Sequence, residues 1–130
     1  MKKIVKKMLK IYIPYSNLDW LNYKLVKESL TAHHIIKRCD GGKLEWNNIA
    51  ILNDVSHQYL HLIECLDINT YDELNKMFKF INQQREEPTE EQRQIIEYLL
   101  CDFEKEHRWD KGSNGKLLLQ YKYLKRDYQS

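Results

Sequence analysis

Four of the five histidines of this chain lie between residues 33 and 61. His33 and His34 are adjacent, whereas His57 and His61 are four positions apart and would share one face of a helix. Such a pair can bind one metal ion, although a pair alone is more often part of a solvated helix face. A strand that returns straight into that helix would bring His33 or His34 against it. Three imidazoles around one divalent ion would leave positions for a phosphate oxygen and water, as catalysis requires.

Two short strands and a helix are the elements that would position these histidines. The segment LTAHHII, residues 30–36, is short and rich in β-branched residues, which is typical of a strand, and NIAIL is a second apolar strand. The Asp-Gly-Gly sequence between them predicts a turn or loop. NDVSHQYLHLIECL then begins with a candidate Asx cap and has helical periodicity.

Helices are expected on both sides of this centre. Ser16, with Asp19 in the first turn, predicts a helix over residues 17–29, because Leu18, Leu21 and Leu25 would fall on one face. Capping-box patterns predict two later helices, and they begin at Thr70 (with Glu73) and Thr89 (with Gln92). Residues 1–13 fit either a helix or a strand, and so does LLLQYKYL near the end of the chain.

The composition is that of a globular protein of one domain. The 130 residues are 42% hydrophobic and 31% charged, with only four glycines and two prolines. Cys39, Cys65 and Cys101 are scattered without a CxxC pair, which favours a reducing, cytoplasmic location over a disulfide scaffold. No segment reaches the roughly 18 apolar residues of a membrane span.

The small net charge of +2 conceals an asymmetry along the chain. Residues 1–30 carry seven lysines against two acidic residues, and residues 111–130 carry five basic residues against Asp127. Residues 67–110 carry twelve acidic and six basic residues. If the two ends met on one face, they would form a surface that attracts phosphate, whereas separate ends would simply be solvated lysine-rich segments.

The central residues resemble the HNH endonucleases, which have a ββα-metal fold. That family combines a histidine pair, a Gly-Gly in the hairpin loop, an asparagine before an apolar run, and two histidines four apart on a helix. The corresponding residues here are His33, His34, Gly41, Gly42, Asn48, His57 and His61. The resemblance covers about residues 30–66. Many family members add two CxxC pairs that bind a structural zinc ion, and this chain lacks them.

The resemblance implies a role for each of these residues. His34 would be the general base that activates water, and Asn48 would brace the hairpin and hold that base in position. His33, His57 and His61 would bind one divalent ion, with Mg, Mn, Ni and Zn as candidates. Lys37, Arg38 and Lys43 lie close enough to the pair to contact a DNA backbone, although a solvated basic turn remains an alternative.

The expected fold class is therefore α+β: a ββα-metal core at about residues 30–66, flanked by an N-terminal helix and two C-terminal helices. Residues 1–130 would form a single domain, with a helical extension at 70–108 and a basic segment at 111–130. The resemblance implies a metal-dependent endonuclease that hydrolyses DNA phosphodiester bonds, with double-stranded DNA as its partner, as suits a phage, a mobile element or a defence system. The alternatives are an HNH-fold module that binds nucleic acid or protein without cutting, and a structural zinc site closed by His34.

Overall fold

The structure is a computed structural model that describes residues 3–12, 17–123 and 126. Its regular elements are α1 (Lys3–Ile11), β1 (Leu30–His34), β2 (Ile49–Asn53), α2 (Asp54–Leu66), α3 (Ile68–Gln84), α4 (Glu90–His107) and α5 (Gly112–Tyr123). Short 3-10 turns lie at Lys27–Ser29, Arg38–Asp40 and Trp46–Asn48. The α+β class and the strand–loop–strand–helix order at the centre are therefore confirmed.

The two strands form an antiparallel hairpin with His33 opposite Ala50 and His34 opposite Ile49. All five residues of β2 are buried, whereas β1 is buried only at Leu30 and His33. β2 runs straight into α2, so the chain turns from the sheet into the helix at Asn53 and Asp54. This arrangement brings the start of α2 against the strand that carries the histidine pair.

The prediction of a helix over residues 17–29 is wrong. This segment is an irregular loop, in which an isolated bridge joins Leu18 to Lys24 and only Lys27–Ser29 form a 3-10 turn. Asn17 and Asn22 have φ angles of 58° and 67°, in the left-handed region that interrupts a helix and that asparagine tolerates well. The N-terminal helix of this protein is instead α1, and Ser16, the expected cap, lies outside the described residues.

A buried carboxylate holds this loop in place. Asp19 is fully buried, and its Oδ1 accepts hydrogen bonds from the backbone N–H groups of Leu21 (2.9 Å) and Tyr23 (3.0 Å). Its Oδ2 accepts from the backbone N–H of Asn53 at 3.0 Å and from the Ser56 hydroxyl. Asp19 thus ties the loop to the start of α2. The Asn53 side chain does not cap α2, because it bonds the backbone of Val26 and Lys24.

The two long helices form close to the expected positions. α4 begins after Thr89 with the expected capping box to Gln92. α3 begins two residues before Thr70, because the Asp67 side chain accepts the hydrogen bond from the Thr70 backbone N–H and serves as the cap. The prediction of a capping box at Thr70 is therefore wrong, although the predicted helix is confirmed. The segment left open near the end of the chain is helical over Gly112–Tyr123.

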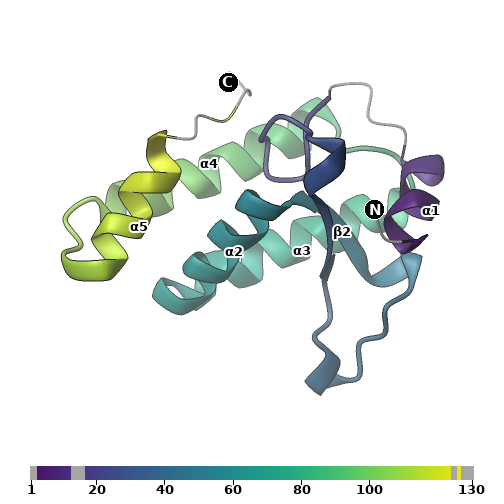
Figure 1. Cartoon of the computed structure of the whole chain (residues 1–130), viewed down its shortest axis with the longest axis horizontal. Helices are drawn as coiled ribbons and strands as arrows, with labels where there is room; N and C mark the ends of the chain where they lie inside the picture. Colours follow the sequence, from purple (N-terminus) through teal and green to yellow (C-terminus); the bar gives the residue numbers. More distant parts are fainter. Residues whose placement is uncertain (1–2, 13–16, 124–125, 127–130) are drawn as a thin grey trace.

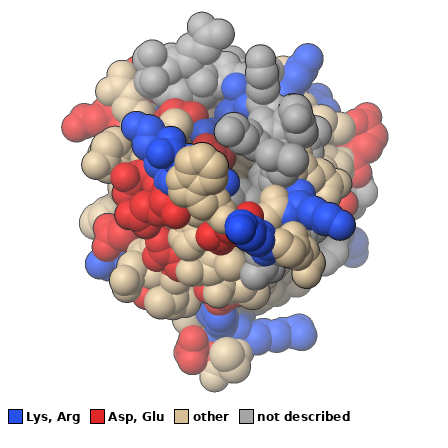
Figure 2. Space-filling view, turned by 90° about the vertical axis from the view of Figure 1, so that its left-hand side faces the viewer, with Lys and Arg blue, Asp and Glu red and all other residues tan. Residues whose placement is uncertain are grey.

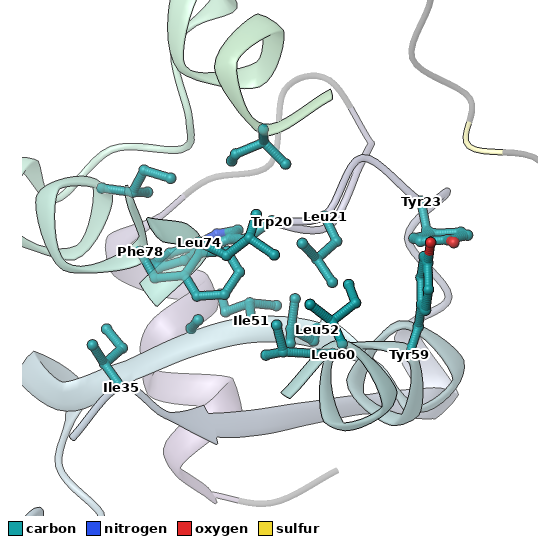
Figure 3. Packing of buried hydrophobic residues seen from close by; sticks show 14 of the residues in the cluster. Trp20, Leu21, Tyr23, Ile35, Ile51, Leu52, Tyr59, Leu60, Leu74 and Phe78 are labelled. Carbon is teal, nitrogen blue, oxygen red and sulfur yellow. The ribbon is translucent and has the colours of Figure 1, made fainter. Parts of the chain in front are cut away.

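The apolar core lies between the hairpin, the loop before it and the helices. Figure 3 shows Ile51 and Leu52 of β2 beside Leu60 of α2, with Trp20, Leu74 and Phe78 close by. At the far side of the cluster the rings of Tyr23 and Tyr59 meet edge to face, with centroids 6.4 Å apart. The loop that replaces the expected helix therefore still supplies core residues.

The helices α1 and α5 lie at opposite ends of the long axis of the molecule (Figure 1). The described basic residues of these two helices therefore do not share one face, whereas Arg126, beyond α5, lies 6.0 Å from the centroid of the Tyr23 ring. The loop between β1 and β2 projects from the lower edge of the same view. Among the described residues, no helix is long and apolar enough to cross a membrane.

Candidate metal centre and active site

The fold brings His33, His57 and His61 together. The ring of His33 on β1 lies 5.3 Å from that of His57 and 6.4 Å from that of His61, measured between centroids. The rings of His57 and His61 stack on one face of α2, with centroids 4.8 Å apart. These are the three residues that the resemblance to the HNH endonucleases assigned to a divalent ion.

The separations suit a shared ion, although the rings must turn to bind it. Metal–nitrogen bonds of about 2.1 Å place imidazole centroids around one tetrahedral ion roughly 5 Å apart. Among the described residues, however, the nitrogens of these three rings do not all lie within 4.8 Å of one another. The His61 side chain is 57% exposed and has room to rotate toward the others. In ligand chemistry and position, the three residues therefore fit a divalent ion.

Each of the three rings also has a polar neighbour at one nitrogen. Nδ1 of His57 lies 2.9 Å from the Thr31 hydroxyl, and Nε2 of His33 lies 2.9 Å from Oδ1 of Asn75. Nδ1 of His61 is 3.6 Å from a carboxylate oxygen of Glu64. Such outer partners orient metal-binding histidines and set which nitrogen carries the proton. Thr31, Glu64 and Asn75 were not among the residues expected from the sequence.

His33 is the most enclosed member of the cluster. Its side chain is buried against the rings of Tyr71 and Phe78 on α3, with centroids 6.2 and 5.9 Å away. Burial lowers the pKa of His33 to about 4, and the hydrogen bond with Asn75 opposes that shift. The ring is therefore neutral at pH 7, which is the form that binds metal ions.

His34 ends β1 and points away from His33, because successive side chains of a strand alternate between its two faces. Its Nε2 is buried and has no hydrogen-bond partner among the described protein atoms. A buried polar atom without a partner costs free energy, so this nitrogen is suited to accept a hydrogen bond from another molecule. The structure thus separates His34 from the three clustered rings.

Asn48 joins the two sides of the hairpin loop. Its Oδ1 accepts from the Ile36 backbone N–H at 2.8 Å, and its Nδ2 donates to the carbonyls of Ile36 and Lys43, both at 3.0 Å. The Asn48 carbonyl accepts from the backbone N–H of Ile35 at 2.9 Å, next to His34. The side chain itself bonds the loop backbone rather than the His34 ring.

The Gly-Gly pair serves the same loop in two different ways. Gly41 has a φ of 89°, in the left-handed region that favours glycine. A Cβ on Gly42 would lie 1.8 Å from the Ile36 carbonyl oxygen and 2.9 Å from Nδ2 of Asn48. Gly42 is therefore required for the close approach that lets Asn48 bridge the loop.

The three basic residues near the histidine pair have different surroundings. Arg38 and Lys43 are exposed on the projecting loop, which Figure 2 shows at the lower edge of the molecule with basic and acidic groups together. Lys37 instead forms an ion pair with Glu64 of α2, and its ammonium lies 5.6 Å from the centroid of the Tyr71 ring. The bond to Glu64 raises the pKa of Lys37, so this cation is already partnered.

A second group of potential ligands lies elsewhere, at the end of α4. Ligand atoms of Asp67, Glu106 and His107 all lie within 4.8 Å of one another. Nδ1 of His107 is 3.0 Å from Asp110 and its Nε2 is 3.8 Å from Asp67, whose other oxygen caps α3. The contacts of His107 with Asp67 and Asp110 therefore join the start of α3 to the end of α4.

Comparison with known proteins identifies the central segment. The family model described as HNH endonuclease matches residues 21–62, from the loop before β1 to the last turn of α2. No match was found among curated proteins or among solved structures. The matched residues include the whole hairpin and His33, His57 and His61, but not Glu64 or Asn75. Residues 21–62 of this chain are therefore similar to the HNH endonuclease family.

Proposed function

We propose that this protein is a metal-dependent endonuclease that hydrolyses DNA phosphodiester bonds. The observation that carries the proposal is the meeting of His33, His57 and His61 within a segment of the HNH endonuclease family. In this proposal the ββα core at about residues 30–66, the helices that follow it and the basic C-terminal segment form one functional domain.

His33, His57 and His61 are the residues that would hold the ion. A bound divalent cation, of which Mg, Mn, Ni and Zn are the candidates, would act as a Lewis acid toward the charge that develops on the leaving 3′ oxygen. The partners at Thr31 and Asn75 support this assignment, because each can orient a ring from one of its nitrogens.

His34 is the proposed general base. It would take a proton from water, whose oxygen forms the new bond to phosphorus while the bond from phosphorus to the 3′ oxygen breaks. The products are then a 5′-phosphate and a 3′-hydroxyl. Nε2 of His34 is the atom suited to this proton transfer, because it lacks a hydrogen-bond partner among the described protein atoms. Asn48 would position this base indirectly, through the loop backbone that it bridges.

The projecting hairpin loop is the proposed contact with the DNA backbone. Arg38 and Lys43 are exposed there, and cations at such positions bind phosphates without reading sequence. Lys37 would have to exchange Glu64 for a phosphate, so its contribution is expected to be smaller than that of the other two.

The decisive experiment is cleavage of supercoiled plasmid with Mg²⁺, Mn²⁺, Ni²⁺ or Zn²⁺, comparing wild type with His34→Ala. Loss of a general base should reduce the rate by about 100- to 10,000-fold. His107→Ala is the matched control, because His107 lies in the separate ion-pair group and should leave the rate within about twofold of wild type. Equal cleavage by wild type and His34→Ala would refute the role of His34.

One observation favours the alternative of a binding module that does not cut. The nitrogens of the three clustered rings do not converge fully in the described residues. A module of this kind would bind DNA in a salt-dependent manner and leave it intact with every ion in the same assay.

A further inference from the structure

We infer that Asn75 of α3 is a positioning residue for the metal centre, because it holds His33 in the tautomer in which Nδ1 would be the nitrogen that binds a metal ion. The inference rests on the proposed function, since it assigns His33 to a metal ligand set. Asn75 lies thirteen residues beyond the end of the segment that matches the HNH family model.

The contact that carries the inference is the 2.9 Å approach of His33 Nε2 to Oδ1 of Asn75. An amide oxygen can only accept a hydrogen bond, so Nε2 must carry the proton and donate it. In a neutral imidazole the other nitrogen then has a lone pair and no proton. Nδ1 is then the nitrogen that is able to bind a cation.

The amide of Asn75 is itself oriented by a neighbour one helical turn earlier. A side-chain hydrogen bond joins Asn75 to Tyr71. Because the amide oxygen of Asn75 lies at Nε2 of His33, its NH₂ group is the part of the amide that can donate to the Tyr71 oxygen.

The same helix also limits the orientation of the His33 ring. Tyr71 and Phe78 both meet that ring edge to face from α3, and α3 packs against α2 and β2 (Figure 1). Helix α3 therefore supplies a wall for the ring and, through Asn75, the acceptor for its proton. Helix α2 supplies His57 and His61 beside His33 of the hairpin, and α3 covers the His33 ring.

The first test is ¹⁵N NMR of the histidine rings in the metal-free full-length protein. We expect wild-type His33 to be the Nε2–H tautomer at pH 7, and Asn75→Leu to shift it toward a mixture of tautomers. Wild-type His33 with its proton on Nδ1 would overturn the inference without reference to any variant.

The second test is the affinity for Zn²⁺, measured by competition with a chromophoric chelator. Asn75→Leu should weaken binding by about 10- to 100-fold, which is the usual effect of removing an outer partner. Asn75→Asp keeps the acceptor and should retain both the tautomer and the affinity to within a few fold. Asn69→Leu places the same side chain at an exposed asparagine of α3 and should leave both unchanged.

Equal Zn²⁺ affinities for wild type and Asn75→Leu would overturn the inference. An equal loss of Zn²⁺ affinity in Asn75→Asp and Asn75→Leu would also overturn it. Failure of the proposed function is visible separately. A protein whose Zn²⁺ affinity depends on Asn75 but that leaves plasmid intact with every ion supports the positioning role and refutes cleavage.

Discussion

At the scale of single residues, His33 and His34 are neighbours with separate surroundings. His33 is enclosed by aromatic rings and lies beside His57 and His61, whereas His34 is directed away from them. Strand geometry alone produces this separation, because adjacent side chains leave a strand on opposite faces. Two identical residues therefore have the separate surroundings that the proposed roles of metal ligand and base require.

This separation makes a prediction for metal binding. His33→Ala should weaken Zn²⁺ binding, measured by isothermal titration calorimetry, by more than about 100-fold, since loss of an outer partner alone costs 10- to 100-fold. His34→Ala should bind Zn²⁺ with wild-type affinity. If both substitutions weakened binding to the same extent, His34 would be a fourth ligand, and the site would be a closed structural one.

The two adjacent glycines make a second prediction at this scale. Gly42→Ala forces a methyl group against the Ile36 carbonyl and should lower the free energy of unfolding by about 2–3 kcal/mol. Gly41→Ala is the matched control, because its Cβ would meet nothing within 4 Å and only the positive φ opposes it. That change should cost about 1 kcal/mol. Urea denaturation measures the free energy of unfolding of both variants. A larger loss for Gly41→Ala than for Gly42→Ala would contradict the prediction.

At the scale of elements, the loop over residues 17–26 replaces a helix and is held by buried polar groups. Asp19 bonds the loop to the start of α2, and the buried Arg93 of α4 donates to the Asp19 carbonyl at 2.9 Å and to Asn22 Oδ1 at 3.0 Å. These contacts join three elements that are distant in sequence. The loop therefore holds the hairpin in position, which is the role that we had expected of a helix over these residues.

Asp19 predicts a pH dependence of stability. Burial raises its pKa to about 6, against the opposing hydrogen bonds from Ser56, Asn53, Leu21 and Tyr23. Between pH 3.8 and 6 the folded state keeps a proton that the unfolded state has released, so this contribution to stability is full below pH 3.8 and declines as the pH rises through 6. The decline amounts to about 3 kcal/mol.

Comparison with Asp19→Asn isolates this contribution from the other titrating groups. Denaturant melts at pH 4, 5, 6 and 7 should show that the stability of wild type relative to Asp19→Asn increases as the pH falls from 7 to 4. A decrease over the same interval would mean that the hydrogen bonds outweigh burial and lower the pKa of Asp19.

At the scale of the whole molecule, the described basic residues of α1 and those of α5 do not form a single face. α1 and α5 lie at opposite ends (Figure 1), and Arg126 beyond α5 pairs with Glu97 and Glu104 of α4. Part of the basic C-terminal segment is therefore neutralised by the acidic middle of the chain. Arg38 and Lys43 of the hairpin loop are exposed cations that follow His34 closely in the sequence.

This arrangement predicts which cations matter for DNA binding. The double substitution Arg38→Gln with Lys43→Gln should weaken DNA binding at low salt and reduce the slope of log affinity against log salt by about 1–2. The control with Lys111→Gln and Lys116→Gln removes two exposed cations at α5 and should leave the slope unchanged. Fluorescence anisotropy over a salt series measures both, and equal slopes for the two variants would contradict the assignment.

The sequence by itself determined the parts of this protein that depend on neighbouring residues. The spacing of His57 and His61, the two short strands, the α4 capping box and the asparagine before β2 were all legible, because strand alternation, helix periodicity and caps are local. The tertiary structure alone decided the loop around Asp19, the pairing of Lys37 with Glu64, the separation of α1 from α5 and the contact of Asn75 with His33. Each of these joins residues far apart in the chain, and a pattern read along one segment carries no information about which distant group will lie beside it.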